Sequence, residues 1–231
     1  MYQFKDDSLM LQNDLYQINM AESYWNDGIH ERTAIFDLYF RNMPFNSGYA
    51  VFNGLKRVID FIENFGFSDA DIDYLKTIGY KDDFLSYLKN LKFTGNIRSM
   101  QEGELCFGNE PLIRVEAPLI QAQLIETILL NIINFHTLIA TKASRIRQIA
   151  MNDTLMEFGT RRGQEIDAGL WGARAAFIGG FDSTSNVRAG KLFDIPVSGT
   201  HAHALVQTYG EEYTAFKKYA ERHKNCVFLV R

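Results

Sequence analysis

Two histidines stand one residue apart in the stretch IPVSGTHAHALVQTYG, residues 195–210, of a chain with five histidines in all. A close pair of imidazoles can ligate a metal, take part in phosphate chemistry or do neither. A zinc site would need further ligands, but no cysteine lies nearby and no carboxylate stands at helical spacing from both His201 and His203. The sequence therefore predicts no metal site here. A histidine at a strand-to-helix turn instead suits contact with phosphate, as a nucleophile or as an electrostatic partner.

Two adjacent arginines follow the apolar segment TLMEFG, residues 154–159, which is typical of a short buried strand. Each guanidinium presents paired donors in one plane, so Arg161 and Arg162 together can fork around a phosphate or a carboxylate. A solvated basic loop is the alternative that the residues alone leave open. The pair is therefore a candidate anion site.

Small polar residues fill a second strand end, in GGFDSTSN at residues 179–186. The two glycines allow a close approach of the backbone, and the side chains of Asp182, Ser183, Thr184 and Ser185 can bind an anion or a sugar. Capping of the helix that follows is the simpler role for Ser185. We take Ser183 as the substrate-binding candidate of this group.

An aromatic residue near the start of the chain, Tyr16, lies in the stretch LQNDLYQINMAESYW, residues 11–25. Its neighbours Leu15, Ile18 and Met20 are apolar, so an amphipathic helix with Tyr16 as a core aromatic is one interpretation. The other interpretation is functional, because a tyrosine ring can stack on an aromatic substrate while its hydroxyl stays in a polar environment.

The elements that must position these residues change character along the chain. From about residue 152, short apolar strands alternate with helices, which is typical of parallel β/α units whose ligands lie beyond the carboxyl ends of the strands. The sequence predicts strands at 154–159, 195–199 and 226–230, a turn or strand end at 181–185, and helices at 164–180, 186–194 and 203–223.

The first half of the chain predicts a mixture of strands and helices. A helix over residues 68–79 has the clearest limits, because a serine precedes its acidic first turn and Gly79 ends it. A long apolar segment over residues 117–150 follows the last strand, and we expect it to split near Asn134 into a buried helix and a more basic one. The sequence further predicts strands at 33–41, 95–101 and 112–117, and a helix at 81–91.

Composition narrows the class of protein. Hydrophobic residues make up 46% and charged residues 23% of the chain, as in ordinary globular proteins, and the net charge of −4 disfavours binding to nucleic acid or to anionic membranes. No signal peptide or membrane-spanning run is evident, so we expect a cytoplasmic protein. Cys106 and Cys226 lie in apolar contexts and are expected to be buried free thiols.

Five segments taken in order resemble the nicotinate phosphoribosyltransferase family: LQNDLYQINMAESYW, FDLYFRNMPFNSGYAVFNGL, MEFGTRR, GGFDSTSNV and GTHAH. The resemblance spans about residues 10–230. It implies that the protein forms nicotinate mononucleotide from nicotinate and phosphoribosyl pyrophosphate, coupled to hydrolysis of ATP. It also implies Mg²⁺ on the pyrophosphate, and a homodimer whose active site is completed across the subunit interface.

The resemblance assigns roles by position. His203 is the fifth residue of the GTxAH motif and corresponds to the histidine that becomes phosphorylated, whereas His201 occupies the variable third position. Thr200 corresponds to a residue that contacts nicotinate. Tyr16 corresponds to the tyrosine that stacks on the pyridine ring. Arg161 and Arg162 together correspond to the arginine pair near the substrate carboxylate and phosphates.

The resemblance also implies a fold class. It is an N-terminal α/β domain, at residues 1–133, followed by an irregular parallel α/β barrel like that of type II phosphoribosyltransferases, beginning in residues 134–231. Three or four β/α units cannot close a barrel, which takes about eight strands. Family members are about twice as long, so we expect an incomplete barrel and a truncated chain.

Three alternatives stay open at this point. The chain can belong to a nicotinamide or a quinolinate phosphoribosyltransferase, since such enzymes share parts of the pattern. It can also be an inactive nicotinate-binding or assembly fragment of the same fold. In that last case it would bind nicotinate at most and turn nothing over.

Overall fold

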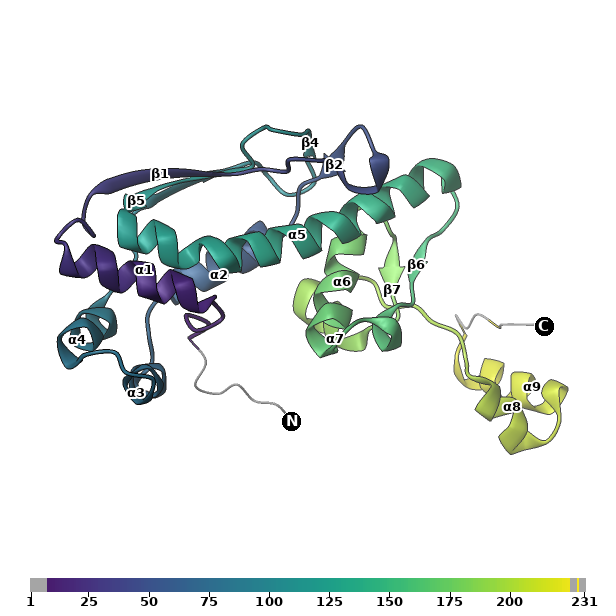
Figure 1. The fold of residues 1–231 in the computed structure, drawn as a ribbon. Helices are drawn as coiled ribbons and strands as arrows, with labels where there is room; N and C mark the ends of the chain where they lie inside the picture. Colours follow the sequence, from purple (N-terminus) through teal and green to yellow (C-terminus); the bar gives the residue numbers. More distant parts are fainter. Residues whose placement is uncertain (1–7, 225–227, 229–231) are drawn as a thin grey trace. The chain divides into compact units, whose positions relative to one another are not determined.

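The structure is a computed structural model that describes residues 8–224 and 228 (Figure 1). Contacts between residues divide the chain into an N-terminal unit, Met1–Thr141, and a C-terminal unit, Lys142–Arg231. This boundary falls inside one long helix, α5 (Leu119–Ala150), eight residues after the boundary expected from the sequence. The two units are described separately.

A three-stranded antiparallel sheet forms the frame of the N-terminal unit, with β5 between the other two strands. Ile113, Val115 and Ala117 alternate along β5 toward the core, as a strand with one buried face requires. On the other face Arg114 donates two hydrogen bonds to Asp37, at 2.7 and 2.8 Å, and this arginine lowers the pKa of the Asp37 carboxyl. The predicted strands are confirmed as β1 (Thr33–Leu38), β3 (Asn96–Ser99) and β5 (Ile113–Pro118), and a two-stranded sheet joins β2 (Ala50–Val51) to β4 (Leu105–Cys106).

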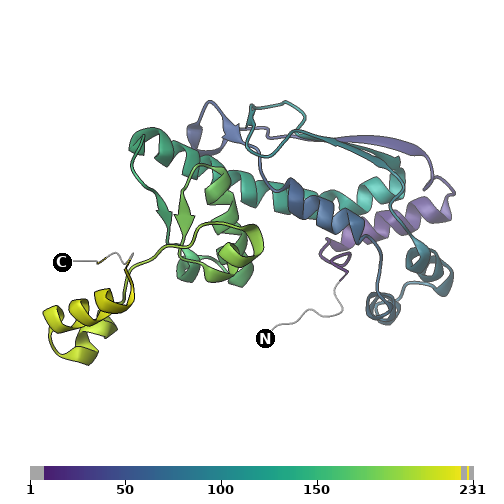
Figure 2. The same cartoon turned by 180° about the vertical axis from the view of Figure 1, so that it is seen from behind.

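Helix α5 is one continuous helix of 32 residues, so the predicted break near Asn134 is wrong. Asn131 and Asn134 are exposed, which places both polar residues on the outer side of the helix, where they do not interrupt it. The large apolar buried residues of α5 in the N-terminal unit recur at helical spacing and pack in its core: Ile120, Leu124, Ile125, Ile128, Leu129, Ile132 and Ile133. Figures 1 and 2 show α5 running alongside the sheet.

Burial also accounts for the apolar character of α5. The helix is long and apolar enough to cross a membrane by length and composition, yet 56% of its most apolar window is buried inside the protein. Two buried hydroxyls of α5 have hydrogen-bond partners in the segment 51–53. Thr141 accepts a hydrogen bond from Val51 N at 2.9 Å, and Thr137 accepts one from Asn53 N at 3.2 Å. Burial of this kind is that of a core helix.

Among the remaining helices of the N-terminal unit, α3 has a side-chain cap. Ser68 and Asp71 form a reciprocal capping box at the start of α3, which confirms the predicted limits of that helix. Trp25 of α1 packs on Phe84 of α4, with ring centroids 5.7 Å apart. The unit contains α1 (Leu15–Asn26), the short 3₁₀ helix η1 (Pro44–Asn46), α2 (Leu55–Glu63), α3 (Asp69–Thr77) and α4 (Asp82–Asn90).

The C-terminal unit contains the predicted parallel β/α arrangement. Strand β6 (Met156–Glu157) pairs in parallel with β7 (Ser183–Thr184), and Thr184 forms a further parallel bridge with Val197. The strand predicted at 195–199 is reduced to this single bridge. The helices of this unit, besides the end of α5, are η2 (Thr160–Arg162), α6 (Ile166–Ile178), α7 (Val187–Phe193), α8 (His203–Tyr209) and α9 (Glu212–Arg222).

The single helix predicted over 203–223 is wrong, because the structure has two. Gly210 adopts a left-handed conformation, φ +73°, and ends α8. The carboxylate of Glu211 then accepts a hydrogen bond from Thr214 N and caps α9. The strand predicted at 226–230 lies outside the described residues, apart from Phe228.

Cys106 is a buried free thiol, as predicted, whereas Cys226 lies outside the described residues. Burial raises the pKa of Cys106 from 9.0 to about 11, and its Sγ lies 3.5 Å from Ala50 O. The raised pKa leaves about one Cys106 thiolate in a thousand at pH 8.

We expect Cys106, the remaining thiol in a Cys226→Ser variant, to show no reaction with a disulfide reagent at pH 8 until urea unfolds the protein. Full titration of one thiol in the native protein would contradict the burial.

Candidate active site

A cavity of about 1030 Å³ opens at the carboxyl ends of the two parallel strands of the C-terminal unit. Three loops contribute most of its lining: one follows β6, one follows β7 and one follows the bridge at Val197. The C-terminal end of α9 contributes the rest. It is lined by Phe158, Thr160, Arg161, Ser185, Val187, Val197, Ser198, Gly199, Thr200, His201, Ala202, Tyr219 and His223. The position matches the strand ends at which parallel β/α folds bind ligands.

The arginine pair lies on the short 3₁₀ helix that follows β6. Gly159 O accepts hydrogen bonds from Arg162 N at 2.8 Å and from Gly163 N at 3.0 Å, which close this turn. Arg161 lines the cavity, whereas Arg162 is exposed and is not among the lining residues. Within residues 8–224 neither guanidinium forms an ion pair with a carboxylate, so the charge of Arg161 is available to an anion in the cavity.

Asp182 takes part in a structural network. Its carboxylate accepts hydrogen bonds from Leu155 N at 2.7 Å and from the Arg147 guanidinium at 2.5 Å. The hydrogen bond from Leu155 N and the one from Arg147 both lower the pKa of Asp182. Arg147 also donates to Gly180 O at 2.7 Å and to Asp153 O at 2.7 Å. The interaction therefore joins the segments that precede β6 and β7, and Asp182 is not among the residues that line the cavity.

The serines and the threonine after Asp182 have different environments. Ser183, the predicted substrate-binding residue, is 7% exposed, and its Oγ is buried without a hydrogen-bond partner in the described part of the chain. Thr184 is also buried, whereas Ser185 lines the cavity. The cap of α7 is provided by Asn186, whose Oδ1 accepts from Ala189 N at 3.0 Å. Ser185 is therefore the residue of this group that is placed to meet a ligand.

The two histidines of GTHAH face different surroundings. Thr200 and His201 line the cavity, and the His201 ring packs against aromatic rings of the same unit, with centroids 5.0 Å from Phe216, 5.8 Å from Phe228 and 6.2 Å from Tyr219. His203 is exposed as the first residue of α8 and is not among the lining residues. The structure therefore brings His201 to the cavity and leaves the predicted catalytic residue, His203, outside its lining.

Tyr16 belongs to the N-terminal unit, at the second residue of α1. Its side chain is 51% exposed, and its hydroxyl accepts a hydrogen bond from the Nε2 of buried Gln17 at 3.1 Å. The same Gln17 nitrogen lies 2.9 Å from the Glu126 carboxylate on α5. Tyr16 lines a pocket of about 570 Å³ that also contains Asp14, Tyr39, Arg41, Asn131 and Asn134. Its aromatic face is therefore accessible, which argues against a purely core role.

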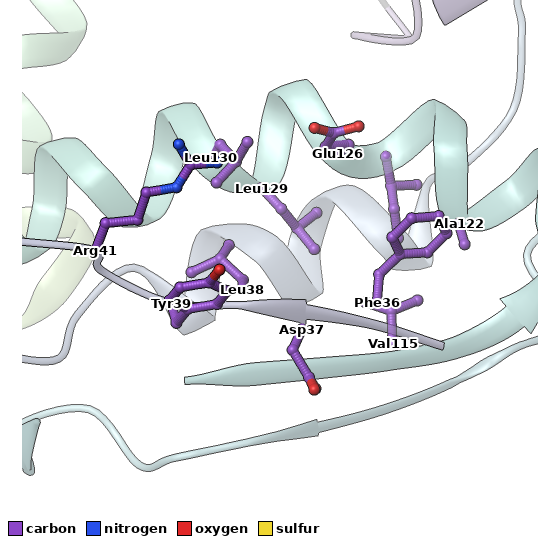
Figure 3. A pocket seen from close by; sticks show the side chains of 11 residues that line it. Phe36, Asp37, Leu38, Tyr39, Arg41, Val115, Ala122, Glu126, Leu129 and Leu130 are labelled. Carbon is purple, nitrogen blue, oxygen red and sulfur yellow. The ribbon is translucent and has the colours of Figure 1, made fainter. Parts of the chain in front are cut away.

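A smaller pocket of about 220 Å³ shares several of these residues (Figure 3). Side chains of β1 and α5 face each other across it, and Arg41 reaches toward Leu130 of α5 (Figure 3). Asp37 points away from α5, toward the face on which it binds Arg114. The smaller pocket is lined mostly by apolar side chains and does not include Tyr16.

The described residues contain no group of three or more histidine, cysteine, aspartate or glutamate side chains that could hold a metal ion. Asp182 and Glu157, two acidic side chains near the strand ends, are both engaged by protein donors. A divalent cation bound here would therefore take most of its ligands from a substrate and from water.

The nicotinate phosphoribosyltransferase (NAPRTase) N-terminal domain family matches residues 11–134. Nicotinate phosphoribosyltransferase of Bacillus subtilis is 66% identical over 230 residues, which cover 99% of this chain and 47% of that protein. The chain belongs to the nicotinate phosphoribosyltransferase family. It spans about half the length of this relative.

More distant members of the nicotinate phosphoribosyltransferase family agree with this assignment. The enzyme of that name from Caenorhabditis elegans is 44% identical over 210 residues, 88% of this chain and 37% of that protein. The crystal structure of human nicotinic acid phosphoribosyltransferase matches with a TM-score of 0.80 and 39% identity, over 85% of this chain and 40% of that chain. The predicted family and fold class are thus confirmed.

A nicotinate-nucleotide pyrophosphorylase from Pyrococcus furiosus shares the fold of this family member with a TM-score of 0.79 and 22% identity. The structural match covers 99% of this chain and 51% of the Pyrococcus furiosus chain. At this identity the likeness shows the fold alone.

Several residues at the cavity of this family member were not predicted from the sequence. Ser198, Tyr219 and His223 line it, and no spacing in the sequence pointed to them. Glu157 had a visible signal, since it is a carboxylate inside an otherwise apolar strand next to the arginine pair. A charged residue in such a strand needs a partner, which is a reason to look for one.

Proposed function

We propose that the protein is a nicotinate phosphoribosyltransferase that acts as a cytoplasmic homodimer. It would form nicotinate mononucleotide from nicotinate and phosphoribosyl pyrophosphate, with hydrolysis of ATP. The observation that carries the proposal is the cavity at the parallel strand ends, which presents Arg161, Ser185 and Thr200 in a chain of this family. An unpaired guanidinium beside hydroxyl groups suits the carboxylate of nicotinate and the phosphates of the sugar donor.

Each group has a defined task in the proposed reaction. Ribosyl transfer passes through a cationic state at the ribose C1 while negative charge grows on the departing pyrophosphate. Positioning and charge stabilisation therefore supply most of the rate enhancement. Arg161 would bind the anionic groups, Thr200 and Ser185 would donate hydrogen bonds, and Tyr16 would stack on the pyridine ring in the partner subunit's site. Arg162, which does not line the cavity, would add positive charge beside it. Ser183 is buried, so its hydroxyl would contact a substrate only after a local rearrangement that exposes it.

ATP and Mg²⁺ complete the proposal. Because Mg²⁺ in proteins commonly keeps several waters and is bound by substrate phosphates with one or two carboxylates, it does not need a cluster of protein ligands. His203 is the group we propose to accept phosphate from ATP. Phosphorylation of this exposed histidine would add negative charge and acceptor oxygens at the end of the GTHAH segment, and this change would couple ATP hydrolysis to binding of the sugar donor.

Nicotinate binding tests the proposal through Tyr16. We expect Tyr16→Ala to weaken binding of nicotinate to the intact protein by about tenfold or more, because stacking of a base on an aromatic ring contributes about 1–3 kcal/mol. Tyr16→Phe keeps the ring and should stay within about threefold of the original affinity, since only the hydrogen bond from Gln17 is lost. Calorimetric titration with nicotinate measures both.

Competing ligands separate the alternatives. Nicotinate should bind more tightly than nicotinamide, which lacks the carboxylate, and than quinolinate, which carries a second one.

Unchanged nicotinate affinity in Tyr16→Ala would make Tyr16 a packing residue. Tighter binding of nicotinamide or quinolinate would replace the proposed substrate. Binding of nicotinate without product formation by the intact protein would favour the inactive binding fragment.

A further inference from the structure

Glu157 lies at the point where the three loops around the cavity begin. It is the last residue of β6 and the register partner of Thr184, the last residue of β7. Thr184 in turn forms the bridge to Val197, and its carbonyl oxygen accepts a hydrogen bond from Ser198 N at 3.0 Å. Glu157 does not line the cavity. Its side chain therefore acts on the site only through its neighbours.

One carboxylate oxygen of Glu157 sets the loop that carries the arginine pair. Oε1 accepts a hydrogen bond from Gly159 N. Gly159 O accepts the bonds from Arg162 N and Gly163 N that form the turn. A Cβ at position 159 would lie 2.7 Å from Oε1, so a side chain there would displace the Glu157 carboxylate from this position. The orientation of the turn is thus tied to the Glu157 side chain.

The other carboxylate oxygen sets the loop after β7. Oε2 accepts a hydrogen bond from Thr184 Oγ1 at 2.7 Å, and Thr184 is 1% exposed. Since its hydrogen is committed to Glu157, the hydroxyl presents a lone pair to Asn186 N, which donates to it at 3.0 Å. Asn186 caps α7 and donates to Gly169 O of α6 at 3.3 Å. The same carboxylate thereby fixes the segment that contains Ser185.

We propose that Glu157 is a positioning residue that holds the Thr160–Arg162 turn and the Ser185–Asn186 segment in register, so that Arg161 and Ser185 face one ligand. This inference rests on the proposed function for the identity of the ligand. Two hydrogen bonds hold the partly buried Glu157 carboxylate in place, and its removal leaves Gly159 N and Thr184 Oγ1 without this acceptor. Misplacement of a binding group by about 1 Å is enough to lower activity by about a hundredfold.

The test compares Glu157→Ala with Glu157→Gln. Alanine removes both acceptors. The glutamine amide can accept from Gly159 N through Oε1 and donate to Thr184 Oγ1 through its nitrogen, while the threonine hydrogen turns to Glu157 O, which lies 3.4 Å away. We expect Glu157→Ala to weaken nicotinate binding by about tenfold or more and Glu157→Gln to stay within about threefold, given the strength of hydrogen bonds to charged groups.

Amide signals in the NMR spectrum report the positioning itself. In Glu157→Ala the Gly159 amide should lose its downfield shift and exchange with solvent at least about tenfold faster, while in Glu157→Gln it should keep most of its protection. Thr184→Val, which keeps the shape of the side chain, should disturb the Asn186 amide and leave Gly159 in place. Thr184→Ser should restore Asn186.

The outcomes separate this inference from the proposed function. If Glu157→Ala loses the Gly159 signal but binds nicotinate as tightly as the original protein, Glu157 does not position the site. Equal losses in Glu157→Gln and Glu157→Ala would make its charge, not its hydrogen bonds, the cause and would also overturn the proposal. If the original protein binds no nicotinate, the proposed function fails, and the two amide signals alone decide whether Glu157 holds the loops. If Glu157→Ala does not fold, the Thr184 pair provides that decision.

Discussion

Replacing His203 with alanine is expected to abolish ATP-dependent phosphorylation of the intact protein that carries this sequence. A phosphoryl group on histidine requires an accessible imidazole nitrogen, and His203 is exposed at the start of α8. Labelling with ATP that carries a radioactive terminal phosphate should give an acid-labile, base-stable product in the original protein. We expect the same label to fall to background in the His203→Ala variant.

His201→Phe is the matched control for this experiment. The His201 ring packs against Phe216 and Tyr219, and phenylalanine preserves that packing while removing both nitrogens. The variant should therefore keep most of the label. Equal loss of label in the two variants, or a label that survives in His203→Ala, would overturn the roles that we assign to the two histidines.

Gly95→Ala is expected to cause a large loss of stability in the N-terminal unit. A Cβ at this position would lie 2.4 Å from Ala117 Cβ and 2.8 Å from Glu116 O. Both residues belong to the central strand β5, which has a neighbour on each side and cannot shift without disturbing the sheet. Overpacking of this kind costs about 1–3 kcal/mol, and we expect the upper end of that range. Urea unfolding followed by circular dichroism measures the change in the unfolding free energy.

Gly48→Ala provides the comparison for Gly95→Ala. Gly48 is exposed, a Cβ there would meet no heavy atom within 4 Å, and its φ is not in the left-handed region. The variant should differ from the original protein by no more than about 0.5 kcal/mol. If Gly95→Ala is as stable as Gly48→Ala, the close approach between residue 95 and β5 is not present in solution.

Features with a local cause could be predicted from the sequence. The limits of α3 follow from Ser68, Asp71 and Gly79, because a capping box and a terminal glycine act over a few residues. The parallel arrangement of β6 and β7 followed from the alternation of strands and helices. The positions of Arg161 and Thr200 at the cavity followed from their places at strand ends.

Features that depend on distant contacts could not be predicted. Nothing in the sequence shows that Asn134 faces away from the core of the N-terminal unit, so the continuity of α5 was missed. Ser183 and Ser185 look equivalent in the sequence, and only the pairing of β7 buries one and leaves the other at the cavity. The role of Glu157 depends on its register with Thr184, 27 residues away.

The position of the unit boundary within α5 has a consequence for limited proteolysis. A protease binds its substrate in an extended conformation, whereas the backbone around residues 141 and 142 is helical and its amides are already bonded within the helix. Cleavage there would first require local unfolding. It would leave carbonyl groups without partners at the new C-terminal helix end and amide groups without partners at the new N-terminal helix end. A protease therefore reaches connecting loops such as residues 195–202 more readily than the junction itself, and a fragment trimmed to residue 141 would carry an open helix end.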